Sequence, residues 1–500
     1  MSAGAAHRRA AGRLLAALLA LLAAGAAAAA ADWRAVVPEL FPEATLVGEM
    51  GGEPPVAEVR AGAEVVGHVA LTDRVAPVPA YSGEPISALL GIGAGGRLRG
   101  VRIVSHQEPI LAAGVSDRQL AEFVAQYRGL PADVRIQVGG GAREGYTVID
   151  GLSGATITAM SLDASIQATA RQSAEALGLT GAAEAVEPVW KRNWRERRWE
   201  IAVLLAALAL LTTVLVFQDA FARRPRLVTV IRRGFLVFTL GFIGWYALAQ
   251  LSVVNVFTFL HAVTGEFRWE TFLVDPLLFL LWGFVAVAML LWGRGVFCGW
   301  LCPYGALQEL ASLLGRRLGL PQWRFPTAVH DRLWALKYVL FLGLFGLALQ
   351  SLVTVQPYLE AEPFKTAITL RFQREWPFVA YAALFVVVSM FNPKFYCKYV
   401  CPLGAALAIP ARLRLLDWLR RRKECGRPCQ ICAVECDVQA IRATGEINVN
   451  ECHHCLDCQL LYYDDHRCPP LVERRRRREK SRAAWEKVRA SVPAERTGDD

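Results

Sequence analysis

The chain has 500 residues, 54% of them hydrophobic, and a formal net charge of +10 at pH 7. The hydrophobic residues are concentrated in long apolar blocks, which excludes a single soluble domain and indicates a multi-domain membrane protein. The positive charge is mostly a membrane-topology signal, and a solvated or lipid-facing tail explains the arginine run at 474–478 better than a nucleic-acid site does.

Residues 1–31 have the pattern of a secretory signal peptide. Basic residues precede an apolar stretch, and the small residues at 29–31 offer a cleavage site. The alternative is an uncleaved membrane anchor. A cleaved signal commits the segment 32–190 to export.

The segment 32–190 is expected to form an exported α+β domain. It contains no cysteine, which suits an oxidising compartment. Runs of β-type residues predict two strands, and apolar residues at helical spacing predict two helices. These elements are expected at 63–71, 98–104, 117–127 and 161–177.

A glycine-containing segment near the end of this domain runs from Asp150 to Thr158 and reads Asp-Gly-Leu-Ser-Gly-Ala-Thr-Ile-Thr. Gly151 and Gly154 permit a tight turn, and the N–H groups that begin the following helix suit a phosphate. From these residues alone, an ordinary capped helix start is the favoured alternative.

Five apolar segments are predicted to span a membrane, because each is close to the ~20 residues that a bilayer-crossing helix needs. Arginines crowd the connections 218–233 and 293–333, which places these two loops inside, the exported domain outside and the C-terminus inside. The basic residues at 191–198 oppose this topology, although long domains translocate largely regardless of such charge. The five expected spans are 201–217, 234–254, 272–292, 334–355 and 377–391.

Two motifs of the form Cys-x-x-x-Cys-Pro each follow an apolar segment. Their recurrence in a matched context is an internal repeat, and each proline marks the start of the next helix. One pair cannot complete a four-thiolate site, but Cys298, Cys302, Cys397 and Cys401 together could. Thiols that serve packing are the alternative. An iron–sulfur cluster, another metal and a dithiol all remain open for this centre.

The other eight cysteines lie between 425 and 468 in two groups of four. Their spacing matches two [4Fe-4S] clusters in the bacterial pattern, in which the fourth cysteine of each run ligates the other cluster. By that rule one cluster is held by Cys425, Cys429, Cys432 and Cys468. The other is held by Cys436, Cys452, Cys455 and Cys458.

This C-terminal pattern has departures. The first run contains spacings of three, Asp437 stands where proline is usual, and the gap before Cys468 is wide. A structural zinc site is the weaker alternative, because eight cysteines exceed what one tetrahedral zinc needs. His453 and His454 are expected beside the ligands or exposed, and not as ligands.

The sequence Asp-x-x-Ser-Gly-Ala-Thr resembles the flavinylation motif of FMN-binding domains, in which an ApbE-type flavin transferase attaches FMN to the last threonine through a phosphoester. The resemblance implies covalent FMN on Thr156, within a motif that includes Asp150, Ser153, Gly154 and Ala155.

The segments 81–86 and 106–110 also resemble parts of such domains in the NosR/NirI family. Within the second, His106 and Glu108 are candidates for tuning the flavin. Ordinary surface positions are the favoured interpretation of both residues.

The order of the predicted parts resembles the NosR/NirI family over nearly the whole chain. The parts are a signal peptide (1–31), a periplasmic FMN-binding domain (32–190), an all-α membrane domain of five helices (200–417), a bacterial-type ferredoxin domain with two clusters (418–474) and a basic disordered tail (475–500).

Members of that family are associated with nitrous oxide or nitrite respiration. The resemblance implies an electron-transfer component of a bacterial inner membrane, rather than a stand-alone enzyme, that joins a cytoplasmic or quinol donor to a periplasmic reductase such as nitrous oxide reductase. A redox sensor, or a maturation or expression factor for such a reductase, is the alternative. An ion-pump subunit is disfavoured because acidic residues are nearly absent from the expected spans.

Overall fold

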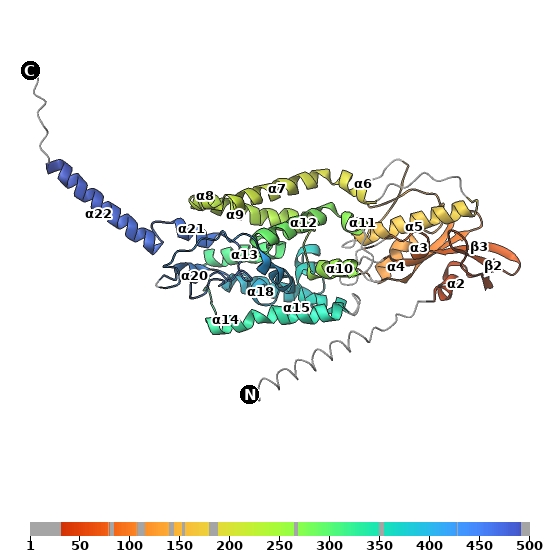
Figure 1. Ribbon diagram of the computed structural model, residues 1–500. Helices are drawn as coiled ribbons and strands as arrows, with labels where there is room; N and C mark the ends of the chain where they lie inside the picture. The colour runs from red at the N-terminus through yellow and green to blue at the C-terminus, as the bar shows by residue number, and fades with distance from the viewer. Residues whose placement is uncertain are drawn as a thin grey trace, which may run out of the picture. The chain divides into compact units, whose positions relative to one another are not determined.

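A computed structural model describes residues 32–491, apart from 79, 81–84, 107, 109–114, 116, 140–144, 153–155, 180–188, 265–268, 350–354 and 428 (Figure 1). The predicted signal peptide therefore lies outside the described residues. The chain divides into two compact units. Unit 1 comprises Met1–Ile201, Leu251–Phe279 and Val339–Glu375; unit 2 comprises Ala202–Gln250, Leu280–Tyr338 and Trp376–Asp500.

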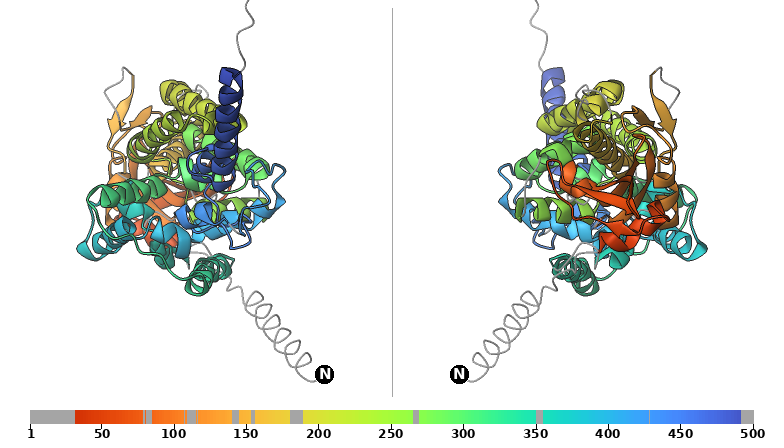
Figure 2. Two further views of the ribbon diagram at one scale, coloured as in Figure 1. Left: turned by 90° about the vertical axis from the view of Figure 1, so that its left-hand side faces the viewer. Right: turned by 90° about the vertical axis from the view of Figure 1, so that its right-hand side faces the viewer.

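A five-stranded antiparallel sheet forms the centre of the N-terminal part of unit 1, and its strands are paired in chain order. The right-hand view of Figure 2 shows these strands in red to orange. A separate parallel pair joins β6 (Ile136–Val138) to β7 (Thr147–Ile149). The strands of the sheet are β1 (Leu46–Val47), β2 (Val56–Ala61), β3 (Glu64–Leu71), β4 (Ser87–Gly93) and β5 (Leu98–Ser105).

Apolar side chains cover both faces of this sheet. One core contains Leu162 and Ile166 of α5 (Thr156–Ala176) and Phe123 of α4 (Asp117–Ala125), packed with residues of β4 and β5. The opposite core gathers around Phe41, which follows η1 (Trp33–Val36) and α2 (Val37–Leu40). A Cβ on Gly67 would lie 2.7 Å from the Phe41 ring, so this strand position must be glycine. The predicted α+β fold of this region is confirmed.

The rest of unit 1 is helical. Asn193 Nδ2 donates to the Val274 carbonyl at 2.7 Å, and Trp194 Nε1 donates to the Leu273 carbonyl at 2.9 Å. These bonds tie α6 (Val189–Glu196) to the end of α11 (Trp269–Leu273). The other short helices are α3 (Thr72–Val75), α10 (Val253–Thr264), η4 (Gln356–Ala361) and η5 (Lys365–Thr369).

A helix occupies each of the five segments that the sequence predicts to span a membrane. Among the described residues, two helical stretches are long and apolar enough to cross a bilayer, Arg198–Val216 and Pro225–Tyr246. The second consists of α9 (Pro225–Phe238) continued by the π-helix η2 (Thr239–Tyr246). The other helices are α7 (Arg198–Val216), α12 (Pro276–Trp292), α15 (Ala335–Ala348) and α17 (Trp376–Phe391).

Unit 2 also contains the cysteine-bearing segments and their flanking helices. Helices of various lengths alternate with loops in this part of the chain. They are α8 (Gln218–Ala222), η3 (Phe297–Leu301), α13 (Pro303–Arg317), α14 (Thr327–Leu333), α18 (Phe395–Tyr399), α19 (Pro402–Ala408), η6 (Pro410–Leu413), α20 (Ile431–Glu435), α21 (Asp457–Tyr463) and α22 (Pro469–Ser491).

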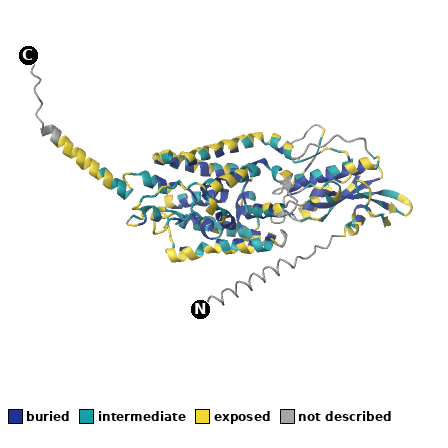
Figure 3. Cartoon of the chain, in the orientation of Figure 1, coloured by how far each residue is buried: buried dark blue, intermediate teal, exposed yellow. Residues whose placement is uncertain are grey.

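Helix α22 corrects the expectation of a disordered tail, at least over 475–491. Its side chains are exposed over nearly all of 473–487, as the yellow colour in Figure 3 shows. Arginine, glutamate, lysine and alanine are good helix formers, and pairs four residues apart such as Arg482–Glu486 (3.0 Å) support an exposed polar helix. The charge run was read as a sign of disorder, whereas it suits such a helix equally well.

Candidate functional site

The two Cys-x-x-x-Cys-Pro motifs form matching turns in unit 2. Cys302 is the N-cap residue of α13 and Cys401 is the N-cap residue of α19, and each is followed by proline at the first helical position. The Cys302 Sγ accepts from the Gly305 N–H at 3.4 Å, and the Cys401 Sγ accepts from the Gly404 N–H at 3.2 Å. The prediction that each proline marks a helix start is confirmed. The two motifs also share the same capping geometry, in which the second cysteine caps the helix that follows it.

All four thiols of the repeat lie in one region. Cys302 is within electrostatic range of both Cys298 and Cys397. Gln308 Nε2 donates to the Cys397 Sγ at 3.1 Å. The Arg294 guanidinium connects the remaining pair, since its Nη1 lies 4.0 Å from the Cys298 Sγ and electrostatic interactions link it to Cys298 and Cys401. The two pairs therefore meet, as the topology argument predicts.

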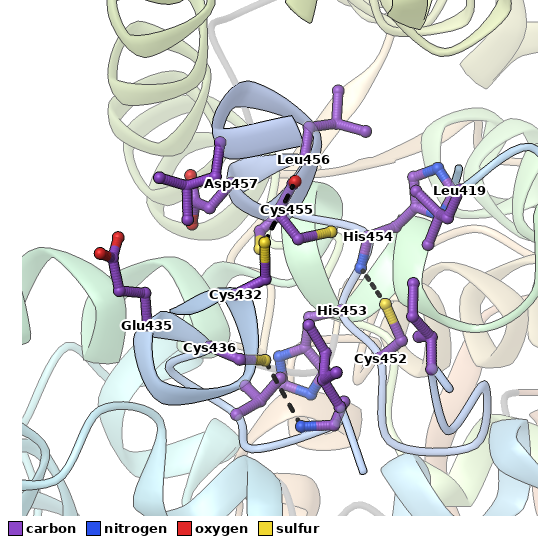
Figure 4. A pocket seen from close by; sticks show the side chains of 16 residues that line it. Leu419, Cys432, Glu435, Cys436, Cys452, His453, His454, Cys455, Leu456 and Asp457 are labelled. Atoms are coloured by element: carbon purple, nitrogen blue, oxygen red, sulfur yellow. Dashed lines mark hydrogen bonds between the residues drawn. The ribbon is translucent and has the colours of Figure 1, made fainter. Parts of the chain in front are cut away.

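The C-terminal cysteines line two hollows, and the first is shown in Figure 4. Cys436, Cys452, Cys455 and Cys458 all line it, together with Cys432. The sulfur atoms of Cys432, Cys436, Cys452 and Cys455 surround the hollow in this view. This set includes all four cysteines that the sequence pattern assigns to the second cluster.

Arg422 and the cysteines of the other predicted group line a second hollow, between α20 and the start of α22. Arg422 Nη1 donates to the Cys468 Sγ at 3.1 Å, which brings a positive charge to this group of thiols. Cys432 lines both hollows, so the two are neighbours. The cysteines of this second hollow are Cys425, Cys429, Cys432 and Cys468.

The arrangement of the cysteines fits clusters better than single ions. Within the part of the chain that the structure describes, no three His, Cys, Asp or Glu side chains approach closely enough to hold one ion. A cluster of four irons is itself several atoms wide, so its thiolates lie further apart than the ligands of a single ion.

Buried polar groups at the first hollow also point to a bound group. His453 is 2% exposed, and neither ring nitrogen has a hydrogen-bond partner among the described residues. Burial lowers the pKa of this imidazole well below its usual range, and burial raises the pKa of the neighbouring Cys452 thiol to about 11. A buried polar group without a partner costs about 1–3 kcal/mol. A thiolate cluster would supply acceptors for the imidazole and would displace the thiol proton.

Two carboxylates are each paired with two basic side chains in this part of unit 2. Glu451 accepts from Arg294 Nη2 at 3.3 Å and from Lys337 Nζ. Glu309 lies 2.7 Å from Arg232 Nη2 and 2.8 Å from Lys394 Nζ. The four basic side chains are at most 8% exposed. No sequence pattern singles these residues out, because the partners are up to 157 positions apart.

The loop that carries Cys452 rests directly on the turn that carries Cys298. A Cβ on Gly295 would lie 2.6 Å from the Cys452 carbonyl oxygen, and a Cβ on Gly299 would overlap the His453 carbonyl oxygen. Trp300 Nε1 donates to the His454 carbonyl at 3.0 Å. Backbone therefore touches backbone between the two cysteine-bearing segments.

The flavin motif is described only in part. Ser153, Gly154 and Ala155 lie outside the described residues, and Thr156 is the first residue of α5. Gln126 holds the backbone of Asp150 from both sides, accepting from its N–H at 2.8 Å and donating to its carbonyl at 3.2 Å. The predicted acceptor residue thus lies at a helix N-terminus, as expected for a phosphate site.

Glu108 is a correction to the sequence interpretation. It was expected at the surface, but it is 1% exposed and accepts from the Thr158 hydroxyl at 2.6 Å. His106, by contrast, is partly exposed. The pairing with Thr158, two residues after Thr156, places Glu108 beside the flavin motif. Glu108 and Thr158 are 50 positions apart, so no local sequence pattern predicts their contact.

Comparison with protein-family models gives three matches. A model described as "FMN-binding domain" matches residues 81–171. One described as "4Fe-4S binding domain" matches 274–321 and 376–424, which are the two segments with the Cys-x-x-x-Cys-Pro motifs. A third, "NosR", matches 423–479, the segment with the other eight cysteines.

Curated relatives agree with these matches. "Regulatory protein NosR" of Pseudomonas aeruginosa is 59% identical over 312 residues, covering 62% of this chain and 43% of that protein. "Protein NirI" of Paracoccus denitrificans is 50% identical over 289 residues, or 58% of this chain and 42% of that protein. A second P. aeruginosa relative named "Regulatory protein NosR" is 63% identical over 87 residues, which are 17% of this chain and 87% of that relative. The chain spans less than half the length of the two longer relatives.

Proposed function

The chain belongs to the NosR/NirI family, and we propose that it carries electrons across a bacterial inner membrane. The donor is cytoplasmic or a quinol, and the acceptor is a periplasmic reductase such as nitrous oxide reductase. Its FMN-binding and iron–sulfur domains are the parts that redox transfer requires. The protein is an electron-transfer component of anaerobic respiration on this proposal, and not a stand-alone catalyst.

The observation that carries the proposal is the backbone contact between the Cys452–His454 loop and the turn at 295–300. A hydrocarbon core of about 30 Å is too wide for one efficient electron step, so carriers must follow one another closely. The contact brings the first hollow next to the four thiols of the repeat. We assign these four thiols, Cys298, Cys302, Cys397 and Cys401, to an intermediate redox centre.

The membrane assignment is supported by the surface of the helices. Two helical stretches are long and apolar enough to span a bilayer. Each of the five helices at the expected spans exposes large apolar side chains, and contiguous apolar surface marks a membrane or partner contact. Examples, one from each helix in chain order, are Leu205, Val237, Val287, Val339 and Leu384. Five spans, an exported FMN-binding domain and a cytoplasmic ferredoxin domain make up the proposed topology.

The residues of the chain have separate tasks in this transfer. The cysteines at the two hollows hold two [4Fe-4S] clusters, each of which accepts and gives up electrons when bound. Cys425, Cys429, Cys432 and Cys468 form one ligand set, and Cys436, Cys452, Cys455 and Cys458 form the other. His453 and His454 are buried in the wall of the first hollow. Thr156 holds FMN covalently after transfer by an ApbE-type enzyme, so the flavin stays with the exported domain.

The test is stopped-flow reduction of FMN in proteoliposomes, with a reductant confined to the side of the ferredoxin domain. Cys302→Ser and Cys397→Ser are expected to stop FMN reduction while both C-terminal clusters and the flavin remain bound. Serine keeps the size of cysteine but is a far poorer ligand for soft metals. Thr212→Ala serves as a control, because it removes a hydroxyl that donates to the Leu208 carbonyl within α7 and contacts no thiol. Wild-type rates in both cysteine variants would contradict the proposed path.

A second function has an observation in its favour, since relatives of this chain carry the name "Regulatory protein NosR". The same centres would then report redox state, or support maturation or expression of a reductase, without carrying flux. Measured FMN reduction slower than reductase turnover in the same vesicles would favour this alternative.

A further inference from the structure

The buried charges around Glu451 are not balanced by carboxylates. Two basic side chains, Arg294 and Lys337, surround this carboxylate, so the group of three carries one excess positive charge. Leaving a charge unpaired in a protein interior costs several kcal/mol even after relaxation. Thiolates that hold a metal cluster are anionic, and they can supply the missing negative charge.

The buried basic side chains face the thiols. Arg294 interacts electrostatically with Cys298 and Cys401, and Lys337 interacts with Cys298. Of the two basic residues beside Glu309, Lys394 interacts electrostatically with Cys397, and Arg232 interacts electrostatically with Cys455. The positive charge is therefore distributed over both the repeat and the first hollow.

Arg294 has the most central position among these cations. It is 1% exposed, its Nη1 donates to the Gly404 carbonyl at 2.9 Å, and a Cβ on Gly404 would lie 3.1 Å from that nitrogen. Its Nη2 reaches Glu451, the residue before Cys452, and Cys452 is itself within its electrostatic range. A single guanidinium thus lies 4.0 Å from the Cys298 Sγ, bonds Gly404 in the turn capped by Cys401, and pairs with the residue that precedes Cys452.

We propose that Arg294 is a counter-charge shared by two redox centres, one held by Cys298, Cys302, Cys397 and Cys401 and the other by Cys436, Cys452, Cys455 and Cys458. The proposal rests on the electron-transfer function proposed above. It makes Arg294 a positioning residue that raises the reduction potential of both centres together.

The electron step is balanced without any other reactant. One electron leaves the group held at the first hollow, which is oxidised, and arrives at the group held by the repeat, which is reduced. No bond breaks and no proton moves. Because Arg294 stays beside both sets of thiolates, it stabilises the added negative charge before and after the step. The electron therefore does not have to move away from the positive charge that stabilises it, and no electrostatic cost of that kind opposes the transfer.

The experiment is a redox titration of the full-length, anaerobically purified protein, followed by electron paramagnetic resonance. Arg294→Gln removes the positive charge and is expected to shift both midpoint potentials to more negative values. A tenfold change in each reduction equilibrium is expected, equivalent to about 59 mV for a one-electron couple. The cluster at Cys425, Cys429, Cys432 and Cys468 should keep its potential.

Two further variants keep the test decisive if Arg294→Gln does not fold. Arg294→Lys retains the positive charge, so both midpoint potentials should stay close to their wild-type values. Glu451→Gln removes a negative charge from the same place, so it should shift both potentials in the opposite direction, to more positive values. Arg374→Gln is the matched control, because it removes another largely buried arginine that pairs with a carboxylate, here Glu360 at 2.7 Å. It should leave all potentials unchanged.

The outcomes separate this inference from the proposed function. If the wild-type protein shows two C-terminal clusters and no additional centre, the proposed path through the repeat fails. If the additional centre is present but neither Arg294→Gln nor Glu451→Gln moves its potential, the shared role of Arg294 is overturned and the path stands. A shift of the midpoint potential at only one of the two centres would also overturn the proposal that Arg294 is shared between them.

Discussion

The carbonyl oxygen of His453 occupies the space that a Cβ on Gly299 would need. The two residues lie 154 positions apart, yet their backbones are in direct contact. Only glycine permits this approach, because any side chain at 299 would push the loop away. The contact is therefore a precise place to disturb the relation between the two cysteine-bearing segments.

Gly299→Ala is expected to separate the Cys452–His454 loop from the turn that carries Cys298. Overpacking of this kind costs about 1–3 kcal/mol, and here the obstacle is backbone, which cannot rotate aside. FMN reduction from the ferredoxin side should slow by at least about tenfold, as measured by stopped flow. Gly283→Ala is the control, since nothing lies within 4 Å of a Cβ at that helical position. Equal rates in the two variants would show that the contact is irrelevant to transfer.

Thr156→Ala should abolish covalent flavin when the protein is made together with an active flavin transferase. The reason is chemical, because the phosphoester needs the threonine hydroxyl. In-gel flavin fluorescence measures the result directly. Thr158→Ser is the better matched control than an alanine, since it keeps the hydroxyl that donates to Glu108. Fluorescence that persists in Thr156→Ala would remove the assignment.

Cys468→Ser and Cys436→Ser should each remove a different cluster. Cys468 lines only the hollow with Cys425 and Cys429, and Cys436 lines only the hollow with Cys452 and Cys455. Each variant should lose about four irons of the eight expected in the C-terminal domain. Iron analysis combined with electron paramagnetic resonance would check this. Stoichiometric zinc in place of iron would reverse the interpretation.

Asp163 predicts a pH dependence of stability in the FMN-binding domain. Its carboxyl group is buried beside Tyr127 and Gln167, and burial raises its pKa from 3.8 to about 7. The folded state therefore binds more protons than the unfolded state between about pH 4 and 7. The free energy of unfolding should fall as pH rises through this window, by an amount on the order of a few kcal/mol.

Asp163→Asn should remove that dependence, because the amide does not titrate. The measurement is thermal melting of the full-length protein at about pH 4.5, within this window, and at about pH 7.5, above it. The melting temperature should fall less between the two pH values for the variant than for the wild type. Asp133→Asn, at an exposed position, provides the comparison. Parallel losses in all three proteins would contradict a raised pKa at Asp163.

Local patterns in the sequence predicted much of this structure. Strands near 63–71 and 98–104, the helices at the expected spans and the proline-started helices after Cys302 and Cys401 all follow from spacing and composition. The grouping of the eight C-terminal cysteines around two hollows was also predicted from spacing. In each case the determining residues lie close together in the chain.

Long-range pairings could not be predicted in this way. Arg294 meets Glu451 and Glu108 meets Thr158 only because distant segments fold together, and neither pair has a sequence signature. The helix at 475–491 was missed for another reason. A run of like charges suggests a solvated, unfolded tail, whereas intervening glutamates at a spacing of four allow a helix.

The contact of the Cys452–His454 loop with Gly295 and Gly299 also affects the order in which the protein can be assembled. A ribosome delivers both Cys-x-x-x-Cys-Pro motifs before it delivers Cys452, so the turn at 295–300 is uncovered for a time during synthesis. Once the loop is seated, that face of the turn is closed by backbone. If the repeat binds a metal, as proposed above, a metal entering from this face would have to arrive before the C-terminal cysteines have folded, which would make cofactor insertion a question of timing as well as affinity.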